Sequence, residues 1–154
     1  MAQGMLHLHN VLRWFIVIFA LITLIKGLAG MNGKKAFSNA DKRYSLLLMI
    51  TADIQLLLGL YLYWSRGWFD VVRSGADVMG NKMNRFFGVE HISGMLIGLI
   101  LIHLGYSAAK NARLLDATRF KRMFWYTFIG LIIIAATVPW PFREVVGRPL
   151  LPGM

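Results

Sequence analysis

Four long apolar stretches, separated by shorter polar connections, dominate the pattern of this chain. A helix needs about 20 residues to cross a bilayer, because it rises about 1.5 Å per residue. Each stretch reaches that length, and we place the spans at residues 5–29, 42–64, 88–110 and 120–140. The pattern therefore predicts an all-α fold, a four-helix transmembrane bundle.

Residues that start or stop helices agree with these boundaries. Ser38 and Asp41 offer an N-terminal cap for the second span. Pro139 and Pro141 cannot both occupy a regular helix interior, so the fourth span should end there. Trp140 between them suits the membrane interface.

Composition supports one membrane domain covering residues 1–154. The chain is 57% hydrophobic, which is too apolar for an ordinary soluble domain, and four spans leave too little chain for a second core. It contains no cysteine, which excludes a disulfide, a thiolate metal site, a covalent c-type haem and an iron–sulfur cluster.

Basic residues are concentrated in two of the three connections. Of 17 lysines and arginines, ten flank the first and third connections, which is typical of cytoplasmic loops. They are Lys26, Lys34, Lys35, Lys42, Arg43, Lys110, Arg113, Arg119, Lys121 and Arg122. We therefore expect both termini on the outer side. The bilayer accounts for the net charge of +10, so no nucleic-acid partner is expected.

The middle connection, residues 65–87, is the only long one and mixes aromatic and apolar residues with charges and glycines. Two interpretations stay open. Part of it forms an interfacial helix that covers the outer end of the bundle like a lid, or the whole is an irregular hydrophobic loop.

Histidines and one glutamate stand where spans one and three begin. The two spans run in the same direction, so His7, His9, Glu90 and His91 should lie at one depth near the outer surface. On a helical projection, the polar residues of the first span, including Arg13, fall within about 160° of arc and should face the bundle interior.

The third span carries a glycine stripe below its first histidine. His91, Gly94, Gly98 and Gly105 share one face, which leaves room for a flat macrocycle or for a closely packed helix. Both readings stay open. His103 lies about 120° away from His91, so we interpret it as a hydrogen-bonded core or helix-contact residue and not as a ligand of a second haem.

Asp53, near the middle of the second span, is costly in hydrocarbon unless it is neutralised or paired. Three roles are open: a salt-bridge partner of Arg13, a protonated acid in a proton path, or a metal ligand. Glu90 is a candidate to hold the second nitrogen of a ligating imidazole.

Four segments, residues 6–14, 54–59, 86–91 and 139–143, resemble small four-span bacterial membrane proteins often labelled cytochrome b or cytochrome-b-like. The resemblance covers nearly the whole chain and implies a multi-pass protein of the bacterial inner (plasma) membrane. It marks His7, His9, Arg13, Gln55, Glu90, His91 and Arg143. Relatives often have histidine where this chain has Asp53, which favours a mixed histidine and carboxylate metal site over haem.

Three functions follow as hypotheses. The first is an electron carrier with one haem b near the outer face, with His91 and either His7 or His9 as axial ligands, and Arg13 or Arg143 for the propionates. The second is a non-catalytic accessory subunit in contact with other membrane subunits or a second copy. The third is a divalent metal site. Its candidate ligands are His7, His9, His91 and Asp53. No nucleophile or phosphate-loop motif suggests a stand-alone enzyme.

Overall fold

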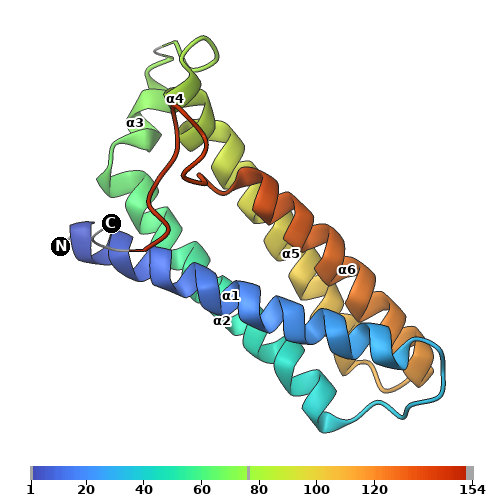
Figure 1. Cartoon of the computed structure of the whole chain (residues 1–154). Helices are drawn as coiled ribbons and strands as arrows, with labels where there is room; N and C mark the ends of the chain where they lie inside the picture. Colours follow the sequence, from blue (N-terminus) through green and yellow to red (C-terminus); the bar gives the residue numbers. More distant parts are fainter. Residues whose placement is uncertain (1, 76, 152–154) are drawn as a thin grey trace.

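The computed structural model describes residues 2–75 and 77–151 and is all-helical in its regular structure. Figure 1 shows four long helical rods, with α1 and α2 side by side and α5 and α6 side by side. The elements are α1 (Ala2–Gly30), α2 (Asn39–Ser65), α3 (Trp68–Arg73), α4 (Lys82–Arg85), a π-helical turn η1 (Phe86–Glu90), α5 (His91–Lys110) and α6 (Asp116–Thr137).

Four helical segments are long and apolar enough to cross a membrane. They are α1, α2, the continuous run Lys82–Lys110 and α6, of 29, 27, 29 and 22 residues. Large apolar side chains such as Ile25 and Leu57 are 68% and 67% exposed, which suits contact with lipid and not with water. The four predicted spans are confirmed as helices of a multi-pass membrane protein.

The fourth span ends at the proline pair, as predicted, a few residues before the approximate bound at residue 140. The helix stops at Thr137, and Val138 is already extended, with φ −73° and ψ 137°. Pro139 removes the backbone donor that the next turn needs and pushes the residue before it out of the helical region. All four spans start a few residues earlier than predicted.

A buried carboxylate ties the first two helices together at their shared end. Asp41 and Ser38 form the expected capping box at the start of α2. Lys26 and Lys35 reach the same carboxylate at 3.1 and 3.0 Å. The Asp41 side chain is fully buried, so these cations and hydrogen bonds offset the cost of removing its charge from water.

The glycine stripe of α5 packs against α6. A Cβ added at Gly94 would lie 2.4 Å from the Thr137 side chain, and one at Gly98 would lie 2.5 Å from Ile134. On α6, Gly130 faces the Gly98 carbonyl in turn. Of the two roles left open for the stripe, close helix packing is therefore the one it has in this structure.

The middle connection contains both a short helix and irregular chain. Residues 68–73 form the short helix α3, whereas the described residues between 74 and 81 contain no helix. Trp68 stacks on Phe87 and Trp64 stacks on Phe69, with ring centroids 5.1 and 4.7 Å apart. These stacks fix α3 against the ends of α2 and the Lys82–Lys110 run.

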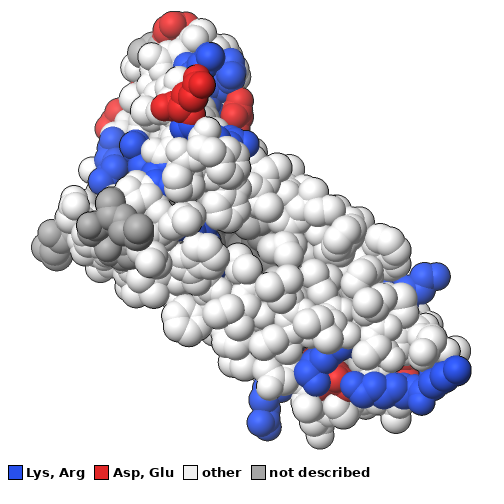
Figure 2. Space-filling view, in the orientation of Figure 1, with Lys and Arg blue, Asp and Glu red and all other residues white. Residues whose placement is uncertain are grey.

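The two ends of the molecule differ in charge. Figure 2 shows lysine and arginine gathered at the end where α1 meets α2 and α5 meets α6, and a mixture of both signs at the other end. Figure 1 places both termini, α3 and the C-terminal segment at that mixed end, where the two helix pairs spread apart.

Replacement of Gly98 by leucine should destabilise the fold by about 1–3 kcal/mol, because the side chain meets Ile134 and the backbone of α6. Thermal unfolding in detergent, followed by tryptophan fluorescence, measures this. Gly4→Leu is the matched control, since nothing lies within 4 Å of a Cβ at Gly4. Equal melting temperatures for the two variants would contradict the packing role.

Candidate functional site

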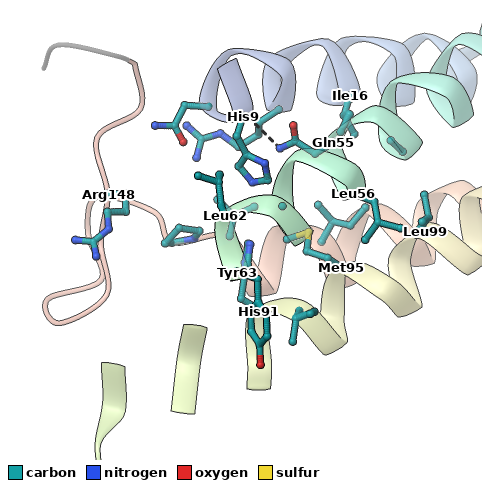
Figure 3. Close-up of a pocket in the computed structure, with 18 of the residues that line it drawn as sticks. His9, Ile16, Gln55, Leu56, Leu62, Tyr63, His91, Met95, Leu99 and Arg148 are labelled. Carbon is teal, nitrogen blue, oxygen red and sulfur yellow. Dashed lines mark hydrogen bonds between the residues drawn. The ribbon is translucent and has the colours of Figure 1, made fainter. Parts of the chain in front are cut away.

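A pocket of about 170 Å³ opens between the splayed helices. Its walls come from α1, α2, α5, α6 and the segment after α6, and Figure 3 shows part of this lining. Most lining residues are apolar, including Leu56, Met95 and Leu99. None of the described lining residues is acidic, whereas Arg13, Arg66 and Arg148 all line it. The pocket therefore combines an apolar body with a cationic, carboxylate-free rim.

Two imidazoles face each other in this pocket. The ring centroids of His9 on α1 and His91 on α5 lie 6.5 Å apart, with their planes at 63°. Gly59 of α2 makes room for His9, since a Cβ at Gly59 would already lie 3.4 Å from His9 Cε1. The prediction that the parallel spans bring histidines together is thus met by His9 and His91.

Two prolines leave carbonyls unpaired at the end of α6. In a regular helix the N–H of residue i+4 bonds the carbonyl of residue i. For Ala135 and Thr137 that residue is Pro139 or Pro141, and neither has an N–H. Unpaired carbonyls inside a membrane protein are costly, so other donors have to satisfy them.

Side chains supply those donors. Trp140 Nε1 donates to Ala135 O at 2.7 Å, Arg143 donates to Ala136 O, and His91 Nδ1 lies 2.7 Å from Thr137 O. A carbonyl oxygen only accepts, so Nδ1 of His91 carries the proton. In the neutral ring Nε2 is then an acceptor, free to act as a ligand.

The other polar atoms near His9 are incompletely satisfied. Gln55 donates to the His9 carbonyl at 3.0 Å, the dashed line in Figure 3. Gln55 Oε1 and His9 Nδ1 are buried and have no partner among the described residues. Buried polar atoms without partners are rare in folded proteins and call for an explanation, such as a bound group.

Arg13 fastens the C-terminal segment to the pocket. Its guanidinium is buried, donates to Leu150 O at 2.8 Å, and lies 5.6 and 5.7 Å from the ring centroids of Trp14 and Trp140. Trp14 Nε1 donates to the same carbonyl at 3.2 Å. Residues 138–151 thereby form part of the pocket wall, with Arg148 among the lining residues.

Aromatic rings surround His91 on the side of the π-helical turn. The Phe86 and Phe87 ring centroids lie 5.9 and 6.2 Å from that of His91. Tyr63 of α2 donates to Gly88 O in the same turn at 2.9 Å. Single π-helical turns are frequent at functional sites, and this one sets the position at which His91 enters the pocket.

One prediction paired Asp53 with Arg13, and the structure does not show that pair. Its carboxylate lies 2.8 Å from Nε2 of His103, and both side chains face outward. His103 is thus a hydrogen-bonded helix-contact residue, as expected, although it is exposed and not part of the core. Asp53 finds this partner because α2 packs directly on α5.

Three further candidates lie outside the pocket. Glu90 pairs with Arg85 at 2.8 Å, so it does not hold His91; the Thr137 carbonyl takes that role. His7 does not line the pocket, and its Nδ1 is buried without a partner. Arg143 lies over the Phe86 ring and bonds α6.

No group of three or more histidine, cysteine, aspartate or glutamate side chains among the described residues is arranged to hold a metal ion. The predicted metal set of His7, His9, His91 and Asp53 is therefore not gathered into one cluster.

Sequence reasoning missed several lining residues. Arg148 lies in the segment after the last span, and that segment carries no helical pattern that would place it. Tyr63 and Arg66 stand at the end of α2, where their residue types also suit a membrane interface. Only the fold shows that they line the pocket, because the sequence alone also fits a role as membrane-interface anchors.

Comparison of the chain with known protein families, with curated proteins and with solved structures finds no match. The interpretation of the site accordingly rests on its own geometry and chemistry.

Arg13→Ala should release the C-terminal segment from the pocket, because it removes the buried donor to Leu150 O. The chain has no cysteine, so a single Val146→Cys substitution provides one labelling site. Val146 is buried, so a maleimide should reach this cysteine only when the segment is released. We expect labelling at least tenfold faster in the Arg13→Ala background. A Phe142→Cys reporter, exposed from the outset, should react equally in both backgrounds. An unchanged rate at Val146→Cys would refute the role of Arg13.

Proposed function

We propose that this protein is a membrane electron carrier that binds one haem b between His9 and His91. The observation that carries the proposal is the pair of facing imidazoles. Two imidazoles on opposite sides of one metal ion, each about 2 Å from it, have ring centroids about 6 Å apart. The observed separation is 6.5 Å.

The donor set also fits the group. Nε2 of His91 is left as a free acceptor by the bond from Nδ1 to Thr137 O, the arrangement usual for a metal-bound histidine. Arg13 and Arg148 offer positive charge to anionic propionates, and the apolar walls suit the macrocycle. When bound, haem would supply one-electron redox chemistry at its iron.

The pocket has to widen for this ligand. Cofactor pockets usually measure about 300–1,000 Å³, more than the volume seen here. Met95 lines the pocket and has an unbranched, flexible side chain, so its rotation is the least costly way to gain room. His9 and His91 would then hold the group, and Phe86 and Phe87, which lie beside His91, would shield it.

The two other hypotheses have less support. A histidine and carboxylate metal site lacks its carboxylate, because Asp53 bonds His103 instead and no described acidic residue lines the pocket. An accessory subunit without a cofactor would leave the facing imidazoles and the buried unpaired atoms unexplained.

The absorption spectrum tests the proposal. Protein expressed with haem supplied and purified in detergent should show a Soret band and sharpen its α band on addition of dithionite. His9→Ala and His91→Ala should each lose most of the bound haem, measured as the pyridine haemochrome.

His103→Ala is the matched control, since His103 lies on the same helix as His91 but outside the pocket. It should keep the wild-type spectrum. Wild-type protein without a Soret band would sink the proposal, and so would equal haem loss in all three variants.

We also propose that the basic end faces the cytoplasm of a bacterium, which puts the pocket near the outer face of the inner membrane. Single cysteines at Lys34 and Met79, both exposed and at opposite ends, test this in intact spheroplasts. A membrane-impermeant maleimide should label Met79→Cys and leave Lys34→Cys unlabelled until the cells are lysed. The reverse pattern would invert the orientation.

A further inference from the structure

The start of α6 presents a lysine and an arginine to the surroundings of the protein. Lys121 and Arg122 are exposed, whereas Phe120 and Met123 on either side of them are fully buried. Among the described residues, neither cation has an ion-pair partner. Neither lines the pocket, so this part of the surface is separate from the proposed haem site.

The basic end as a whole carries far more cations than anions. Residues 26–43 and 110–122 contain ten lysines and arginines but only two acidic residues, Asp41 and Asp116. Both acids are already paired with basic side chains. Figure 2 shows the basic surface that results. The remaining positive charges repel one another, and an anion bound from outside would relieve this repulsion.

Contacts inside the fold fix the direction in which the two exposed cations point. Phe120 packs on Phe37 from the loop between α1 and α2, with ring centroids 4.6 Å apart. Arg119 lies 3.8 Å from the centroid of the same Phe37 ring. Because positions 119 and 120 are held against the protein, the next two positions of the helix face outward. The cations are thus presented without any rearrangement of α6.

The same outward face of α6 continues as an apolar surface. It consists of Trp125, Phe128, Ile129 and Ile132, which are 47%, 37%, 45% and 52% exposed. They follow Lys121 at the spacing of one helical face, and the tryptophan stands one turn away, as in an aromatic belt. From Lys121 to Ile132 the helix rises about 16 Å, which is about half of a hydrocarbon core that is about 30 Å thick. The face therefore matches the depth of one lipid leaflet.

We propose that this face of α6 binds an anionic phospholipid, with the phosphate on Lys121 and Arg122 and an acyl chain along the apolar residues. Basic side chains at the membrane surface attract anionic lipids. A phospholipid joins a negative charge directly to a hydrocarbon chain, in the same order as the cations and apolar residues of α6. A soluble acidic partner would reach the cations alone, because the apolar part lies within the bilayer.

The inference is independent of the proposed function. It requires neither bound haem nor a particular end of the molecule in the cytoplasm, since the cations and the apolar face belong to one helix.

Quenching of tryptophan fluorescence by brominated lipids tests the proposal on the full-length protein in phosphatidylcholine vesicles. The difference between wild type and Trp125→Phe isolates the signal of Trp125, which lies in the proposed site. Brominated phosphatidylglycerol should quench this signal by about twofold or more over brominated phosphatidylcholine at the same mole fraction. An excess of inorganic phosphate at constant ionic strength should leave the preference intact, because phosphate lacks the acyl chain.

The double variant Lys121→Gln with Arg122→Gln should be quenched equally by the two lipids. Arg73→Gln with Lys82→Gln is the matched control, since it removes two exposed cations from the opposite end, and it should keep the wild-type preference.

Equal quenching of the wild-type protein by the two lipids would overturn the proposal without recourse to any variant. The same preference in both double variants, or its loss in both, would also overturn it. Loss of the preference in inorganic phosphate would assign the cations to a free anion instead of a lipid. Haem binding is measured separately, by the absorption spectrum.

Discussion

The hydrogen bond between His91 and the Thr137 carbonyl is the interaction on which the arrangement of the pocket depends. It exists because Pro141 provides no backbone donor for that carbonyl. The bond fixes the plane and the tautomer of His91 and links the start of α5 to the end of α6. The side chains of Trp140 and Arg143 likewise donate to the carbonyls of Ala135 and Ala136. The last carbonyls of α6 are thus satisfied by side chains that lie outside the helix.

Close packing of α5 on α6 makes that bond reachable. Gly94 faces the Thr137 side chain directly, so any larger residue would push the two helix ends apart. At the opposite end, Phe120 and Phe124 pack on Gly30 and Gly27 of α1 and bring α6 against that helix too. The helices are held together there, and the residues that line the pocket come from α1, α2, α5, α6 and the segment after α6.

The sequence predicts the spans well because twenty consecutive apolar residues have few alternatives to a membrane helix. It also predicts that His9 and His91 meet, since parallel helices place their first residues at one depth. It fails for Glu90, which lies in the π-helical turn and pairs with Arg85, a contact that no helical pattern announces. It fails for the partner of Asp53, because no pattern in one helix says which neighbour it will have.

The C-terminal segment has a consequence for the order of assembly. Residues 138–151 follow all four spans in the chain, yet Pro139, Trp140 and Arg148 form part of the pocket wall. During synthesis the ribosome therefore completes the helices before it delivers this wall. Until the segment docks on Arg13, the pocket lacks the part of its wall that Pro139, Trp140 and Arg148 provide.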